Sequence, residues 1–188
     1  TMAAQLLQRI LPWVKEIDDV HDAFFNLPDG LGELVAHLAR GGETQPALRI
    51  AKDLLVVGAT QTAAEPGSYV PHSRRVKACC SAWEYGQILQ RDVQALVHHA
   101  GLPAVLMLIK QLKSALWIVR DSGGQPEPDY SVVWRPAIEP HEQNLANSDD
   151  VADLLISAVR DAVSTLVTDG TLSVRNAAAL LEEESDPV

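Results

Sequence analysis

Apolar residues recur at alternating spacings of three and four along most of the chain, which is the spacing of one buried face of an α-helix. The clearest case is "DDVADLLISAVRDAVSTLVTDG", residues 149–170. We expect Ser148 or Asp149 to cap its start and Gly170 to lie just past its end. Its apolar stripe comprises Val151, Leu154, Leu155, Ala158, Val159, Ala162, Val163, Leu166 and Val167.

A second helix is predicted from Ser81 to Gly101. Ser81 and Glu84 have the spacing of a capping box, in which each side chain accepts a hydrogen bond from the other's backbone amide. Pro103 then stands where a first-turn proline belongs, and a helix to Arg120 follows that is apolar round much of its circumference. We therefore expect that helix to be central. The stripe of the preceding helix is Tyr85, Ile88, Leu89, Val93, Leu96 and Val97.

The same pattern predicts helices over residues 31–42 and 44–57, with Pro46 in the first turn of the latter. Residues 3–26, broken at Pro12, and 172–184 are also helical in period. Because no segment alternates with period two, the sequence indicates an all-α fold, taken as a single domain over residues 1–188. Two long connections, 58–80 and 121–149, carry much of the glycine and proline.

The helices form three successive hairpins, two of which share a short sequence pattern. Leu34-Val35-Ala36-His37 and Leu96-Val97-His98-His99 each precede a glycine turn and a first-turn proline. Successive helical hairpins of this kind are typical of a short α-solenoid, in which antiparallel pairs stack and each buries its open face on the next.

Three segments, "LGELVAHLARGG", "WEYGQIL" and "WRPAIEPHEQN", resemble helical-repeat regions (TPR/HEAT-like) of large bacterial multidomain proteins. Some of those proteins carry a nucleotide-binding module elsewhere, in the manner of signal-transducing NTPases. The resemblance spans about residues 31–161 and implies a scaffold or sensing segment of a longer protein.

Charge and cysteine content narrow the classes of partner. The formal net charge of -10 disfavours nucleic acid and anionic membranes, which carry the same sign. The longest apolar run, Leu102–Ile109, is too short to span a bilayer, and the N-terminus shows no signal peptide. Cys79 and Cys80 are adjacent, so an internal structural disulfide is disfavoured and we expect a reducing, cytoplasmic setting. No third ligand stands at metal-binding spacing from them.

Residues 134–144, "WRPAIEPHEQN", are the segment that most resembles a catalytic or metal-binding site. A zinc protease motif needs a second histidine four residues after the first on a continuous helix, but Leu145 stands four after His141. We therefore predict no metal and no cofactor. One interpretation is a polar cluster of Arg135, Glu139, His141 and Glu142 that fixes the long connection, with Trp134 buried against the helices that carry Trp83 and Trp117. On this interpretation, Trp134→Ala lowers the melting temperature and His141→Ala does not.

Nucleotide-binding and nucleophile motifs are missing from the sequence. The first hypothesis is a non-catalytic scaffold or interaction module that binds a partner protein or another domain of the same chain. The alternative is a ligand-binding or catalytic helical bundle with a pocket lined by Trp134, Arg135, His141 and Glu142. On that alternative, the four side chains must converge on one cavity.

Overall fold

The computed structural model describes residues 27–60, 75–120 and 150–185, and these are predominantly helical, which confirms the all-α prediction. A two-stranded sheet is the exception. The helices are α2 (Leu27–Arg40), α3 (Thr44–Leu54), α4 (Ala82–Gln87), the π-helical η2 (Ile88–Val93), α5 (Gln94–Ala100), α6 (Leu102–Arg120), α9 (Val151–Thr168) and α10 (Val174–Ser185).

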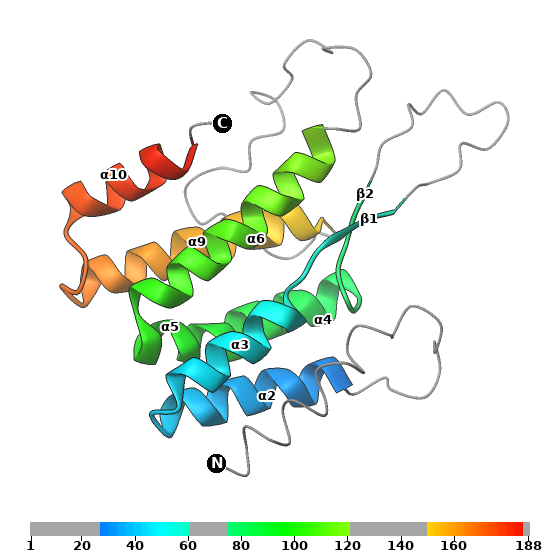
Figure 1. Cartoon of the computed structure of the whole chain (residues 1–188), viewed down its shortest axis with the longest axis horizontal. Helices are drawn as coiled ribbons and strands as arrows, with labels where there is room; N and C mark the ends of the chain where they lie inside the picture. The colour runs from blue at the N-terminus through cyan, green and yellow to red at the C-terminus, as the bar shows by residue number, and fades with distance from the viewer. Residues whose placement is uncertain (1–26, 61–74, 121–149, 186–188) are drawn as a thin grey trace, which may run out of the picture.

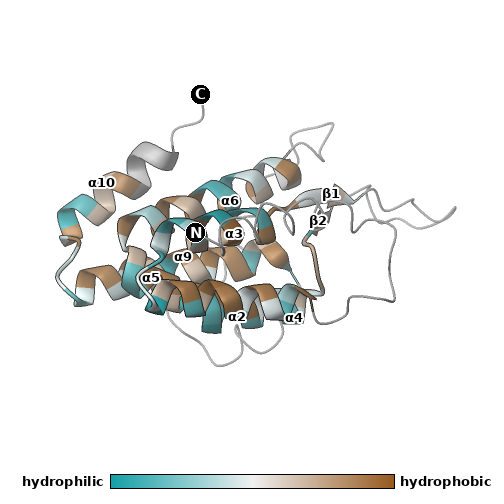
Figure 2. Cartoon of the chain, turned by 60° about the horizontal axis from the view of Figure 1, so that its bottom comes forward, coloured by the Kyte–Doolittle hydropathy of each residue, from teal (hydrophilic) through white to brown (hydrophobic). Residues whose placement is uncertain are grey.

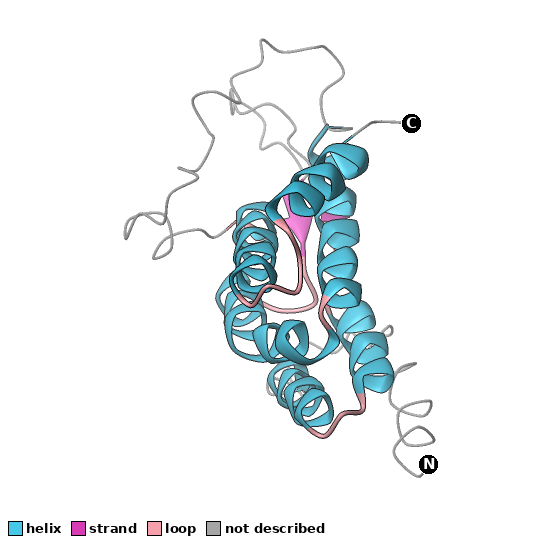
Figure 3. Cartoon of the chain, turned by 90° about the vertical axis from the view of Figure 1, so that its left-hand side faces the viewer, coloured by secondary structure: helices cyan, strands magenta, loops and turns pink. Residues whose placement is uncertain are grey.

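The helices follow one another through space in nearly the order of the chain (Figure 1). Helix α2 lies at one end against α3 and the α4–η2–α5 helix, α6 and α9 pack together in the next position, and α10 lies beyond them. Helix α6 contacts α9, α5 and α3 as well as both strands, as its largely apolar circumference predicts. The view from the side shows the helices as a stack, with the strands visible between them (Figure 3).

Apart from Val167, the residues of the two stripes listed above lie in or against a common core. Hydrophobic and hydrophilic residues occur together on the helices, as amphipathic packing requires (Figure 2). Tyr85, Leu96, Leu108 and Leu155 are completely buried, and they come from three different helices of the predicted set. The core therefore joins all these helices rather than individual hairpins.

The helix predicted after Cys80 begins and ends where its sequence signals stand. Ser81 is the N-cap, and its capping box with Glu84 is present. At the other end Gly101 adopts a φ of 64°, a left-handed conformation that favours glycine. Between these ends the chain passes without interruption through α4, η2 and α5. The π-helical turn was not predicted, because i to i+5 bonding has no simple sequence signature.

The expectation that no segment forms a strand is wrong at one place. β1 (Gly58–Thr60) pairs antiparallel with β2 (Arg75–Lys77), and Ala59 faces Val76 across the pair. Both strands lie inside the connection 58–80. Three residues are too few to show an alternating pattern, so this sheet could not be recognised from periodicity.

The predicted cap of α9 also needs correction. Neither Ser148 nor Asp149 is the N-cap: Asp150 takes that position, and its carboxylate accepts a hydrogen bond from the Ala152 amide at 2.8 Å. An aspartate at any of two or three neighbouring positions can serve this role, so the sequence alone does not select among them.

Within the described segments, none of the helices combines the length and apolar character needed to cross a bilayer.

Candidate functional site

The four residues proposed from the sequence as a ligand pocket, Trp134, Arg135, His141 and Glu142, lie outside the described residues. The same holds for the expected burial of Trp134. The described residues instead present three features with chemical or binding potential: an exposed apolar face on α6, a pair of adjacent thiols, and a buried carboxylate at the crossing of α2 and η2.

Helix α6 exposes large apolar side chains along one side. Leu102, Leu106 and Trp117 have 38%, 40% and 65% of their surfaces exposed, and Leu116 has 46%. Leu102 and Leu106 are four residues apart, and Trp117 follows Leu106 by eleven, so these three share one helical face. We call these four residues, together with Lys110, the α6 outer face.

The charge of α6 is opposite to that of the whole chain. The helix contains Lys110, Lys113 and Arg120 and no aspartate or glutamate, whereas the chain carries a formal net charge of -10. Lys110 is exposed and stands between Leu106 and Trp117 on the same side. The α6 outer face is therefore both apolar and locally basic.

The two tryptophans of the described residues are largely exposed. Trp83 on α4 has 73% of its surface exposed, and Trp117 on α6 has 65%. Tryptophan is usually buried over most of its surface, and exposed tryptophan is enriched where proteins bind partners. These indoles contribute little to the described core.

Cys79 and Cys80 form the second feature, directly before α4. Their Sγ atoms lie 3.7 Å apart, and the Cys79 thiol donates a hydrogen bond to the Leu54 carbonyl at 3.1 Å. The Tyr85 hydroxyl donates to the neighbouring Leu55 carbonyl, also at 3.1 Å. Both carbonyls belong to the C-terminal end of α3, where backbone acceptors lack helical partners. Cys79 and Tyr85 therefore join α3 to the start of α4.

The two thiols differ in acidity because each affects the other. The hydrogen bond from Cys80 favours the thiolate of Cys79 and lowers the pKa of Cys79, although burial acts in the opposite direction. The same hydrogen bond, with burial, raises the pKa of Cys80 well above its usual range. The Leu54 carbonyl accepts a hydrogen bond only from the neutral Cys79 thiol, so this bond, like burial, opposes the lowering of the Cys79 pKa. Burial raises the pKa of Tyr85, which stays a neutral hydrogen-bond donor.

The third feature is a buried carboxylate. Asp92 on η2 is 2% exposed, and both of its oxygens accept hydrogen bonds from the Arg91 guanidinium, at 3.0 and 2.9 Å. Arg91 also reaches Asp29 on α2 at 2.6 Å. These two carboxylates, Asp92 foremost, raise the pKa of Arg91 further above its already high value. With its charge matched twice, Arg91 links η2 to α2 and is a poor candidate for binding an added anion.

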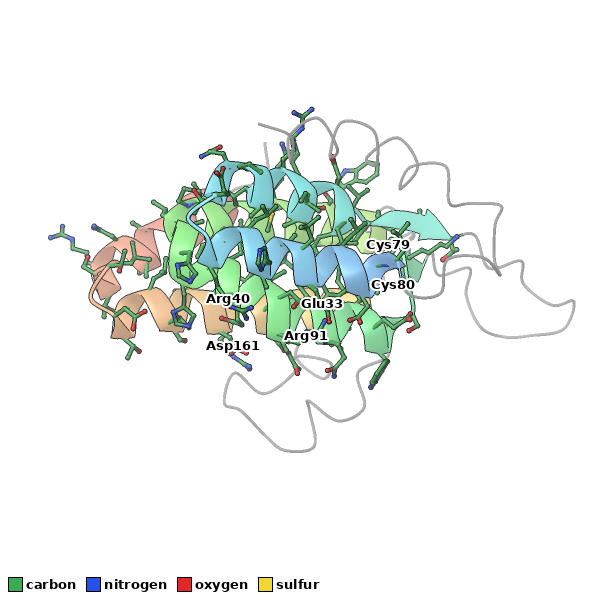
Figure 4. The ribbon with its side chains drawn as sticks, turned by 90° about the horizontal axis from the view of Figure 1, so that it is seen from below. Glu33, Arg40, Cys79, Cys80, Arg91 and Asp161 are labelled. Carbon is green, nitrogen blue, oxygen red and sulfur yellow. The ribbon has the colours of Figure 1, made fainter. Side chains whose placement is uncertain are left out.

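Gly32 makes room for this carboxylate. A Cβ atom built on Gly32 would overlap Asp92 Oδ2 and lie 3.3 Å from Ile88 Cγ1. The close approach of α2 to η2 therefore depends on the missing side chain. Figure 4 shows the cysteines beside the strands at one end of the molecule and Arg91 nearer its middle, with Glu33, Arg40 and Asp161. The thiol pair and the carboxylate are separate features.

The burial of Asp92 was not predicted from the sequence, although the position of Asp92 in its helix indicates it. Asp92 falls within the three-and-four spacing of its own helix, between Leu89 and Val93, so a charged residue occupies a core position. Such a residue predicts a buried, paired carboxylate. Nothing in the sequence pointed to Gly32 as its neighbour, because that contact joins residues sixty positions apart.

Among the side chains that the structure describes, no three from His, Cys, Asp or Glu gather closely enough to hold a metal ion. Comparisons of this chain with protein-family models, curated proteins and solved structures found no match. The site must therefore be interpreted from its own geometry.

Proposed function

We propose that this chain is a non-catalytic helical module that binds a partner protein, or another domain of the same polypeptide, through the α6 outer face. The observation that supports this most directly is the exposure of Leu106 and Trp117 on one face of a helix whose opposite face is in the core. Exposed apolar side chains gathered on one element are typical of binding surfaces, whereas isolated ones are ordinary.

The residue types fit the chemistry of a protein interface. Tryptophan and leucine supply apolar area, and tryptophan is among the residues that most often dominate binding free energy. Lys110 among them adds a charge that selects an acidic partner and accelerates its association. We therefore expect the partner to present an amphipathic helix with apolar residues flanked by aspartate or glutamate, which packs along α6.

The arrangement of the helices supports a repeat-like scaffold for this surface. Helices α2 and α3, then α5 and α6, then α9 and α10 form successive contacting pairs, and the pairs follow one another through space in chain order. We propose that these are stacked antiparallel hairpins of a short α-solenoid, similar to the helical-repeat regions of large bacterial proteins. In such proteins, stacking leaves one long surface free for binding.

The test compares two exposed tryptophans. Parent protein, a Leu106→Asp/Trp117→Ala variant and a Trp83→Ala control are used as bait, and captured proteins are identified by mass spectrometry. Each captured protein is then purified and its affinity for the three baits measured by calorimetry. We expect the α6 variant to bind the purified partner at least about 30-fold more weakly, which corresponds to the minimum loss of about 2 kcal/mol for one hot-spot residue. We expect Trp83→Ala to bind like the parent.

Equal affinity of all three baits for every purified partner would contradict the proposal, as would loss of binding in Trp83→Ala alone. Light scattering on the same samples detects self-association. If the parent is a dimer and the α6 substitutions make it a monomer, the partner on the α6 outer face is a second copy of this chain. Melting curves of the variants show whether they remain folded.

A further inference from the structure

We infer that Cys79 and Cys80 form a preformed dithiol site that binds trivalent arsenicals. These ligands need two sulfur atoms from the protein. The juxtaposition that carries this is the 3.7 Å separation of the two Sγ atoms at the start of α4. This site is independent of the α6 outer face.

The separation suits an atom that bridges the sulfurs. Two bonds of about 2.3 Å, the length of a zinc–thiolate bond, hold their sulfurs about 3.3 Å apart at a right angle and about 3.8 Å apart at a tetrahedral angle. Trivalent arsenic is pyramidal, with bond angles between these two limits, and the 3.7 Å separation lies within the range. A direct disulfide is less well matched, because consecutive Cα atoms are about 3.8 Å apart across a trans peptide and disulfides usually need at least about 4.4 Å. The described residues contain no cis peptide bond that would change this spacing. The spacing therefore disfavours a disulfide between the two thiols and suits one ligand atom bonded to both sulfurs.

The surroundings hold the sulfurs in place and leave them accessible. Both thiols are only partly buried, and Ser81, the next residue, is exposed. In the free protein the Cys79 thiol is fixed by its 3.1 Å hydrogen bond to the Leu54 carbonyl, a bond that is given up when the thiol proton leaves. The capping box between Ser81 and Glu84, with a hydrogen bond of 3.0 Å from the Ser81 amide to the Glu84 carboxylate, fixes the backbone that follows. Little conformational freedom is left to lose when a ligand joins the two sulfurs.

The number of ligands selects the class of bound centre. Structural zinc almost always takes four protein ligands, and no third His, Cys, Asp or Glu completes such a group among the described residues. An aryl arsenoxide, Ar–As=O, keeps its aryl group and needs only two sulfurs. In the reaction two As–S bonds form, the As=O bond breaks, and the two thiol protons leave with the oxygen as one water molecule. Arsenic stays trivalent, so no oxidant or reductant is required.

Phenylarsine oxide is the probe. The chain has only two cysteines, so titration with a chromogenic disulfide reagent counts both thiols directly. We expect one equivalent of the arsenical to bind per chain and to protect both thiols. Release should require a small dithiol, while an excess of monothiol should leave the complex intact, because chelation makes the second bond intramolecular.

Cys80→Ser and Cys79→Ser are the matched variants, and each should bind phenylarsine oxide at least about 100-fold more weakly than the parent, the low end of the gain from a second linked bond. Cys80→Ser keeps the hydrogen bond from Cys79 to Leu54, so it tests the site even if Cys79→Ser folds poorly. Single-serine variants that bind as tightly as the parent would overturn the inference.

A second measurement tests whether the folded chain preforms the site. A ligand that prefers the native protein raises the melting temperature, and one that prefers the unfolded chain lowers it. We expect phenylarsine oxide to raise the melting temperature of the parent and to leave that of Cys80→Ser unchanged. A lower melting temperature for the parent would show that the sulfurs meet more easily in the unfolded chain, and it would refute a preformed site.

Discussion

At the scale of single residues, Gly32 leaves the least room for a side chain of any described glycine, because it lies against the Asp92 carboxylate. Burying a carboxylate is costly unless its charge is matched, and Arg91 provides two charge-assisted hydrogen bonds to Asp92. The space for that carboxylate exists only because position 32 has no side chain. The missing side chain at Gly32 on α2 therefore makes room for the ion pair between Arg91 and Asp92 on η2.

We predict that Gly32→Ala destabilises the protein by about 1–3 kcal/mol, the usual cost of forcing an added methyl group into a packed core. Gly30→Ala is the matched control, because Gly30 lies in the same helix and a Cβ there would meet nothing within 4 Å. That change should raise stability by up to about 1 kcal/mol, since alanine favours the helix. Urea denaturation of the two variants measures both. Equal stability of the two would mean that α2 and η2 do not meet as closely as the structure has them.

At the scale of elements, the helix from Ala82 to Ala100 depends on the residue before it. The Ser81 hydroxyl accepts a hydrogen bond from the Glu84 amide at 3.3 Å, and the Ser81 amide donates to the Glu84 carboxylate. Amides in the first turn of a helix have no helical acceptor, so these bonds replace the missing ones. The cap also directly follows the two cysteines, and it fixes the backbone between Cys80 and the first turn of the helix.

We predict that Ser81→Ala lowers the free energy of unfolding by about 1 kcal/mol, the typical value of an N-cap. Ser114→Ala serves as control: that exposed hydroxyl donates to the Lys110 carbonyl within α6, and alanine favours a helix interior. The control should unfold at the same or a slightly higher urea concentration. A Ser81→Ala protein as stable as the parent would show that the cap is dispensable.

Much of the helical framework was predictable because it rests on local signals. The capping box at Ser81 and the glycine at Gly101 define their helix within a few residues, and the apolar stripes gave its buried face. The β1–β2 pair was not predictable, because three-residue strands are stabilised by their partner and not by their own pattern. The dithiol pair was visible as a sequence, but its 3.7 Å geometry depends on the packing of α3 against the start of α4. The proposed pocket around Trp134 and His141 lies outside the described residues and stays a prediction.

At the scale of the whole molecule, packing is uneven along the stack. Helices α6 and α9 lie within the core, whereas α10 contacts mainly α9. Of the α10 residues from Val174 to Leu180, only Ala177 is buried, and Val174 has 72% of its surface exposed. Elements with few buried apolar contacts open at a lower free energy than the rest of the protein.

We predict that backbone amides of α10 exchange with deuterium at least about tenfold faster than those of α6, which corresponds to a difference in opening free energy of about 1.4 kcal/mol. Hydrogen-exchange mass spectrometry measures both helices in one experiment, so α6 is the internal reference. Protection of α10 equal to that of α6 would indicate that a further surface stabilises it.

The packing of α6 on α9 also closes a long loop of the chain. Thirty residues, 121–150, separate these two helices, whereas only three, Gly41–Glu43, separate α2 from α3. In the unfolded chain, bringing together ends thirty residues apart costs about 2 kcal/mol more than three residues apart, from the logarithmic dependence of loop closure on length. The α2–α3 hairpin can therefore form from local contacts, while the packing of α9 on α6 requires a longer loop to close. The logarithm also means that doubling the thirty residues would cost only about 0.6 kcal/mol, so this pair of helices can keep its packing while the sequence between them grows.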